Sequence, residues 1–344
     1  MSHHTFEVMP NGNILLPVWQ YHSYDEAIAK GLDPDKLGRA MLPDGVKVGK
    51  GMVRGIWPDV IREVERGTGK TVWEWKVWDH IGTTPDKFDI NAFCDLGNIM
   101  LWLAGPDWIH LNGVAYNPET NEIAFTSRNL GEVFIIDYKK NGGIKYRWGN
   151  PANYGKGAAP AGYADDGDQK LFGPHAPDWT AEGTISIMDN GHTRPSGNYT
   201  RAVELDPKKN AVVWQWKASD VRTWDWNFYS QTQSGAQKLP NGNWLITATN
   251  TGGHTIEVMP DKRIVWEFIN PMGKGDKVYA ASNAYGDMAP QLAVHKALRY
   301  AKDDPRFKGR DMSVKHPLMP EGTPNWLKLL DGNNVPPRFN PDKK

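Results

Sequence analysis

The stretch RAVELDPKKNAVVWQW (201–216) decides the fold of this chain, because the chain carries it four times in variant form. Each copy joins a strand with an acidic residue to a second strand built around tryptophan. The turns between them are rich in Gly, Asn, Asp, Pro and Lys, which adopt the backbone angles that hairpins need. The other copies are VIREVERGTGKTVWEW (60–75), VFIIDYKKNGGIKYRW (133–148) and HTIEVMPDKRIVWEF (254–268). Such repetition predicts stacked copies of one supersecondary unit.

The repeat predicts an all-β fold of the propeller type. Apolar and polar residues alternate with period two in the copies, which is the strand pattern. The intervals between the tryptophan strands leave room for three or four strands each, which suits a propeller blade better than a sandwich. We expect about five blades with long loops at 79–106 and 150–171, and a missing first blade, since the chain starts in the middle of one.

Composition limits the classes of partner. The 344 residues include 40 basic and 40 acidic ones, a poor balance for holding a phosphate backbone, so we expect no nucleic acid partner. No apolar run is long enough to span a membrane. The single Cys94 excludes an internal disulfide.

We expect one propeller domain over residues 1–310 and a polar, proline-rich C-terminal tail over 311–344. Helical patterns are confined to 23–32, with Ser23 as a candidate N-cap, and to 288–301.

Three histidines occupy matching places in the repeat. His4, His110 and His175 each precede the first strong strand of a blade, and in a propeller these first strands line the central channel. The DNGHTR loop (189–194) can bring Arg194 toward the same axis. Packing alone gives no reason to repeat histidine at one position, although ordinary buried or surface histidines remain an alternative.

Imidazoles beside an arginine suit two chemistries. One is nucleophilic and acid–base transfer of an anionic group, with arginine neutralising the developing charge. The other is a transition metal bound by histidine. We favour the first, because His3–His4 is the only close histidine pair in the sequence.

The chain resembles the bacterial arylsulfotransferase (aryl-sulfate sulfotransferase) family, whose fold is a six-bladed β-propeller. The resemblance covers most of residues 3–310. The stretches that carry it include HHTFEVMPNGNILL, DWIHLNGVAYNPETNEIAFTSRNLGEVFIID, QKLFGPHAPDW, MDNGHTRPSGNYTRAVELDP and IVWEFINP.

The resemblance implies a ping-pong reaction. A channel histidine takes the sulfuryl group from an aryl sulfate, releases a phenol, and passes the group to an acceptor phenol, with no nucleotide sulfate donor, cofactor or metal. His110 matches the histidine of the family's DxxHxN motif, and Arg194 matches the arginine after DNG. His175 matches the histidine of its QH motif, with Pro174 in place of Gln.

The remaining site residues follow from the same resemblance. His254 is the candidate nucleophile, since it is the histidine of the blade after Arg194. The candidate substrate-binding residues are His4, Asn112, Arg128 and Arg201. The family is periplasmic or secreted, although no signal peptide opens this chain, so a cytoplasmic location stays open.

Two other functions remain open at this stage. One is a catalytically silent propeller that binds or scaffolds other molecules. The other is a lyase or hydrolase that uses the same His/Arg channel, because a fold does not determine a reaction. The oligomeric state is open as well.

Overall fold

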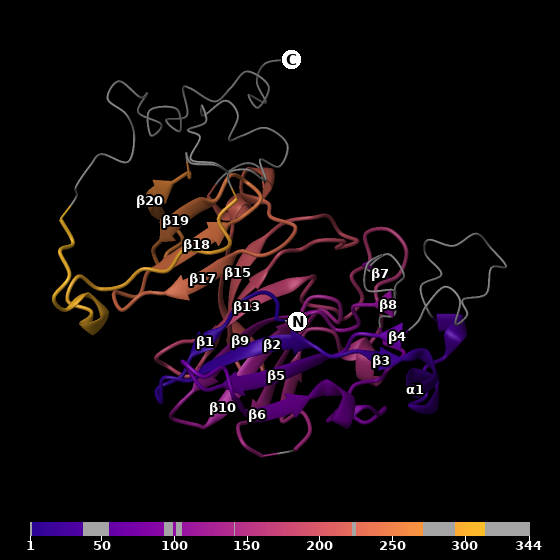
Figure 1. The fold of residues 1–344 in the computed structure, drawn as a ribbon. Helices are drawn as coiled ribbons and strands as arrows, with labels where there is room; N and C mark the ends of the chain where they lie inside the picture. The colour runs from indigo at the N-terminus through magenta and orange to yellow at the C-terminus, as the bar shows by residue number, and fades with distance from the viewer. Residues whose placement is uncertain are drawn as a thin grey trace. The chain divides into compact units, whose positions relative to one another are not determined.

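The computed structural model describes residues 2–36, 55–92, 99–100, 105–140, 142–221, 225–270 and 293–313. They form mostly antiparallel β-sheets with few helices (Figure 1). The chain divides into two compact units, Met1–Lys217 and Ala218–Lys344. Within the described parts, none of the helices has the length and apolar character needed to cross a membrane.

Four sheets have four strands each, and the strands of each sheet are arranged in the order in which they occur along the chain. Three of them lie in the first unit. The first sheet holds β1 (Glu7–Val8), β2 (Ile14–Trp19), β5 (Asp59–Val64) and β6 (Thr71–Lys76). The second holds β9 (Leu111–Asn117), β10 (Glu122–Ser127), β11 (Glu132–Asp137) and β12 (Tyr146–Trp148). The third holds β13 (Pro174–Trp179), β14 (Ile185–Asp189), β15 (Arg201–Asp206) and β16 (Ala211–Lys217).

The second unit contains the fourth sheet. Its strands are β17 (Gly235–Lys238), β18 (Trp244–Ala248), β19 (His254–Val258) and β20 (Ile264–Phe268). The remaining short elements are not part of these four sheets. They are the strand pairs β3 (His22–Ser23) with β4 (Gly55–Ile56) and β7 (Ile99–Met100) with β8 (Gly105–Pro106), and the 3₁₀ turns η1 (Pro34–Lys36), η3 (Val77–His80), η5 (Pro151–Tyr154), η6 (Ala218–Asp220), η7 (Asp225–Phe228) and η9 (Pro305–Phe307).

Each sequence repeat is the hairpin of the last two strands of a sheet. The four copies form β5–β6, β11–β12, β15–β16 and β19–β20. The prediction of strands joined by polar turns is therefore confirmed. The count of about five blades, the missing first blade and the closing of a ring stay predictions. Residues 314–344, most of the predicted tail, lie outside the described residues.

A buried glutamate recurs opposite a tryptophan in these hairpins. Glu63 pairs with Trp73, and Glu257 pairs with Trp266, and in both cases the register shifts directly after the glutamate. Such a shift marks a bulge, which strengthens the local twist of the strand. The Glu63 carboxylate accepts hydrogen bonds from the side chains of two asparagines in the β1–β2 turn, Asn11 and Asn13. The repeated sequence thus specifies both the hairpin and its attachment to the preceding turn.

Aromatic rings fill the space between the first and second sheets. Trp75 lies 5.6 Å from Phe125 and 6.1 Å from Phe88 between ring centroids, and Phe125 stacks on Phe134. The indole nitrogen of Trp75 donates to the carbonyl of Gly142, so burying the ring leaves no polar atom without a partner. A tryptophan of the first repeat therefore also packs one sheet against the next.

One of the two predicted helices is confirmed. Helix α1 (Tyr24–Ala29) begins after Ser23, whose side chain accepts from the Glu26 backbone in a complete capping box. The second prediction is wrong over 293–301, which contains no helix, and 288–292 lie outside the described residues. This segment instead bonds to the fourth sheet, where Arg299 and the side chain of Gln237 exchange two hydrogen bonds.

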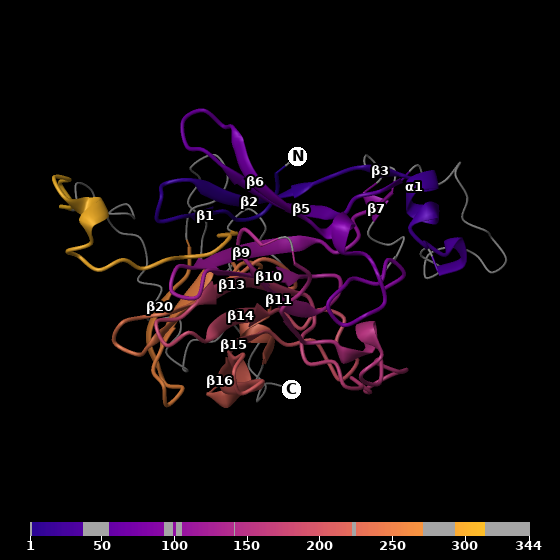
Figure 2. The same ribbon diagram turned by 90° about the horizontal axis from the view of Figure 1, so that it is seen from below.

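The first strands of neighbouring sheets in the first unit lie close together. β9 lies beside β13 (Figure 2), and a Cβ atom added to Gly113 would come within 2.5 Å of Cδ of Pro177. The glycine therefore permits the close approach of the two strands. This approach brings together the chain segments that carry His110 and His175.

Candidate active site

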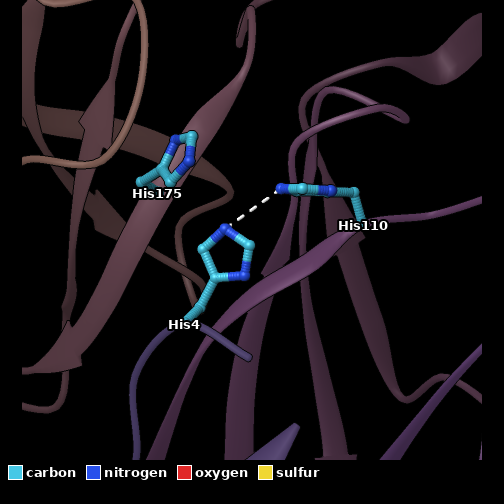
Figure 3. Close-up of side chains that lie close together, drawn as sticks. All are labelled: His4, His110 and His175. Carbon is cyan, nitrogen blue, oxygen red and sulfur yellow. Dashed lines mark hydrogen bonds between the residues drawn. The ribbon is translucent and has the colours of Figure 1, made fainter. Parts of the chain in front are cut away.

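Three histidine rings meet in the first unit, where the first strands of its three sheets begin. His4 precedes β1, His110 directly precedes β9, and His175 lies in β13 (Figure 3). One ring nitrogen from each lies within 4.8 Å of the others. The Nε2 atoms of His4 and His110 are 3.1 Å apart. These three residues occupy matching positions in the repeat, from which we predicted that they lie close together. The structure places them together. We call them the three-histidine centre.

The backbone around this centre adopts unusual angles. His4, His110 and Ala176 have φ values of 58°, 49° and 49°. The left-handed region is uncommon for residues other than glycine, and it clusters at functional sites because the surrounding structure must hold it in place. The register of β13 against β14 also shifts between His175 and Asp178, and such a bulge re-aims a side chain. The fold therefore holds these rings at some conformational cost.

A buried carboxylate orients His110. Nδ1 of His110 donates to the Asp107 carboxylate, whose other oxygen accepts from Nε1 of Trp19 at 2.9 Å. With its proton on Nδ1, the neutral His110 ring directs its lone pair through Nε2 toward the centre. A carboxylate in this place also stabilises an imidazolium when one forms.

His4 is supported by a second histidine. Its Nδ1 lies 2.7 Å from Nδ1 of His3, and Nε2 of His3 lies 2.8 Å from Oδ1 of Asp59. The His3 ring stacks on Trp19 with 4.2 Å between centroids. Burial raises the pKa of Asp59 above its usual range, although His3 and the Leu111 backbone N–H hydrogen-bond to its carboxylate and counteract part of this shift.

His175 is held in one neutral tautomer. Its Nδ1 lies 2.8 Å from Oδ1 of Asn190 and 2.9 Å from the carbonyl of Gly173. The carbonyl oxygen can only accept, so Nδ1 carries the proton and the neutral ring has its lone pair on Nε2. Burial, together with the charges of His110 and Arg128, lowers the pKa of His175 to about 3, although the hydrogen bonds to Gly173 and Asn190 counteract part of this shift. His175 is therefore neutral at physiological pH.

Arg128 is a cation next to these rings. It follows β10, and its backbone N–H donates to the carbonyl of His110 at 3.1 Å. Its charge lowers the pKa of both His175 and His192. The charge of Arg128, which was predicted from the sequence, therefore acts on a member of the centre.

Arg194 and Arg201 share a buried carboxylate. Nη2 of Arg194 and Nε of Arg201 lie 2.6 and 2.7 Å from Oδ2 of Asp189. The Arg194 guanidinium also lies 4.4 Å from the ring centroids of both Phe172 and Tyr199. These contacts hold the loop after β14, which carries Asn190. The predicted contact of either arginine with a sulfate stays a prediction.

Asn112 links the strands that carry the histidines. Its side-chain amide donates to the carbonyl of Pro174 at 2.7 Å and accepts from Thr126 at 2.6 Å. It is buried, so these bonds join β9 to the start of β13. Its predicted role in binding substrate stays a prediction.

His254 lies in the second unit. Its Nε2 is 2.5 Å from Oε1 of Glu267, and its ring meets Phe228 edge-on at 5.0 Å. The start of the fourth sheet lacks histidine, but Gln233 and Ser234 there have positive φ values of 56° and 79°. The fourth sheet therefore has the same positive φ angles near its first strand as the other three sheets, but no histidine there.

The sequence did not predict the supporting roles of His3, Asp59, Asp107 and Asn190. Asp107 stands three residues before His110 in DWIH, a spacing that could have suggested the pair. Asn190 belongs to the DNG motif that was noted for Arg194. Asp59 carries no signal in the sequence, because only the pairing of separate sheets brings it to His3.

We expect Gly191→Ala to destabilise the protein by more than Gly183→Ala. Both glycines have positive φ, 66° and 74°, so both variants incur the left-handed backbone penalty. A methyl group at Gly191 would also collide with the backbone carbonyl of Tyr199, whereas the one at Gly183 meets nothing within 4 Å. Urea denaturation midpoints measure the difference. Equal midpoints for the two variants would contradict the close approach at Gly191.

Comparisons with known proteins identify the family. The family model described as Arylsulfotransferase (ASST) matches residues 48–282, more than half of the chain. The chain belongs to the arylsulfotransferase family. Membership supports a sulfotransferase-like transferase with small-molecule substrates in general. No curated protein matches the chain.

Solved structures show weaker similarity. A protein of unknown function from Bacteroides caccae is 13% identical with a TM-score of 0.41, and the alignment covers 77% of this chain and 66% of that one. A streptogramin B lyase is 10% identical with a TM-score of 0.37, covering 79% and 59%. BamB from Moraxella catarrhalis is 13% identical with a TM-score of 0.32, covering 76% and 55%. The chain thus spans less than two thirds of the length of the lyase and BamB structures, and about two thirds of the first.

Proposed function

We propose that this chain moves a sulfuryl group from an aryl sulfate to a phenolic acceptor, with a sulfuryl-histidine intermediate in the three-histidine centre. The observation that carries the proposal is the state of His175. Its ring is neutral, and its proton is held on Nδ1 by Asn190 and Gly173, so that the lone pair is on Nε2. A neutral, oriented imidazole is the form that acts as a nucleophile.

The first half-reaction uses that lone pair. Nε2 of His175 attacks sulfur, the bond between sulfur and the aryl oxygen breaks, and the electron pair leaves with the phenolate. His110 in its imidazolium form, stabilised by Asp107, gives the phenolate its proton. The positive charge of Arg128 offsets charge that develops on the sulfate oxygens.

The second half-reaction reverses these roles. An acceptor phenol gives its proton to the now neutral His110, and its oxygen attacks the sulfur. The bond between sulfur and nitrogen breaks, and His175 recovers its lone pair. No nucleotide donor takes part in either step. If water replaces the phenol, the same site is a sulfate ester hydrolase, which is the second function that this geometry supports.

Mass spectrometry with 4-nitrophenyl sulfate tests the proposal. Without an acceptor, we expect a burst of 4-nitrophenol and one added sulfuryl group on a histidine peptide. Adding phenol should remove the adduct and yield phenyl sulfate. Release of inorganic sulfate in place of phenyl sulfate would favour the hydrolase, and no release of 4-nitrophenol would favour a catalytically silent binding module.

A further inference from the structure

We propose that the three-histidine centre binds one divalent transition-metal ion through one nitrogen each of His4, His110 and His175. These three nitrogens are the only group of this kind among the described residues, with each ligand atom within 4.8 Å of the others. The proposal goes beyond the transfer reaction, because it concerns a ligand that competes for the same lone pairs.

The distances suit coordination. Imidazole nitrogens lie about 2.0–2.1 Å from Zn²⁺, so two of them on one tetrahedral ion are roughly 3.4 Å apart, and less in a crowded shell. The Nε2 atoms of His4 and His110 are 3.1 Å apart. The third nitrogen is close enough for a small rotation of the His175 side chain to complete the triangle. Figure 3 shows the three rings approaching from three separate chain segments.

Each ring has the support that metal-binding histidines have. Such residues almost always direct their other nitrogen to a carboxylate or a carbonyl, which fixes the tautomer and the ring orientation. His110 has the Asp107 carboxylate, and His175 has the carbonyl of Gly173 and the side chain of Asn190. His4 has the ring of His3, which Asp59 holds in turn.

The ligand set indicates the class of metal. Three imidazoles suit Zn²⁺, Cu²⁺, Ni²⁺ or Fe²⁺, whereas Mg²⁺ and Ca²⁺ prefer oxygen ligands. The Asp107 carboxylate beside His110 favours a cation, and the charge of Arg128 opposes it from the side of His175. A nitrogen that ligates the metal has no lone pair for sulfur. The metal-loaded protein should therefore be unable to form the sulfuryl adduct at His175.

Equilibrium dialysis of the full chain with Zn²⁺, after removal of metals with EDTA, tests the site. We expect one ion per chain, and a loss of affinity of roughly 100-fold or more in His110→Ala and in His175→Ala. His192→Ala is the matched control, since His192 lies near Arg128 but outside the three ligands. Asp107→Asn, which keeps all three ligands, should weaken binding by about 10–100-fold. Circular dichroism verifies the fold of each variant.

Two results would overturn the proposal: no stoichiometric binding, or binding that His110→Ala and His175→Ala leave unchanged. The outcome is separable from that of the transfer reaction. Formation of the sulfuryl adduct in EDTA without any binding of Zn²⁺ would contradict the metal site alone. Binding of Zn²⁺ without formation of the adduct in EDTA would contradict the transfer proposal alone.

Discussion

His175→Ala should lower the turnover of 4-nitrophenyl sulfate by on the order of 10³-fold or more and abolish the sulfuryl adduct. The variant removes the neutral imidazole whose lone pair forms the bond to sulfur, and losing a nucleophile costs more than losing a single charge-stabilising donor. Release of 4-nitrophenol and intact-protein mass spectrometry measure the two effects, with EDTA present to keep the nitrogens free of metal. His192→Ala serves as the control and should retain both activities.

The same experiment separates His175 from the nucleophile predicted by resemblance. His254→Ala should keep the adduct, because Nε2 of His254 is engaged by Glu267 in the second unit. If His254→Ala loses the adduct while His175→Ala keeps it, the assignment to His175 is wrong and the one from resemblance stands. If both variants match the parent in adduct and turnover, the catalytic proposal fails.

Asp189→Asn should destabilise the protein by about 3–5 kcal/mol, because removing one partner of a buried ion pair leaves the other charge without compensation. Asp189 is fully buried, and its carboxylate binds the guanidinium groups of Arg194 and Arg201. Urea denaturation followed by tryptophan fluorescence measures the free energy of unfolding. Asp166→Asn is the control, since Asp166 is more exposed and lies 3.8 Å from Nη1 of Arg194.

The expected difference between these two aspartates bears on the role of the arginines. If Asp189→Asn unfolds at the same urea concentration as the parent, the pair of buried contacts does not support the loop after β14. Arg194 would then be available for the sulfate contact that the resemblance implies. A large loss of stability would indicate that the main role of Arg194 is to stabilise the fold.

The local sequence was sufficient to predict the strands. The alternation of apolar and polar residues and the turn chemistry of 201–216 and its copies predicted four hairpins, and all four are present. The N-terminal cap of α1 could also be predicted from the local sequence, since the side chains of Ser23 and Glu26 each accept a hydrogen bond from the backbone of the other. Such features depend on neighbours within a few residues, so the sequence alone determines them. The segment 293–301 is the exception, because its polar groups are satisfied by a sheet that lies distant in the sequence.

The repeat also predicted that His4, His110 and His175 occupy matching positions, but it did not predict the protonation or hydrogen bonds of their rings. The tautomer of each ring depends on Asp107, Asn190 and, through His3, on Asp59. Burial, which makes His175 neutral, likewise depends on how closely β9 and β13 approach. Charge state and hydrogen bonding are set by what surrounds a side chain in space. The sequence therefore determined which imidazoles meet, and only the tertiary structure decided which nitrogen of each carries a proton and which can bind a substrate or a metal.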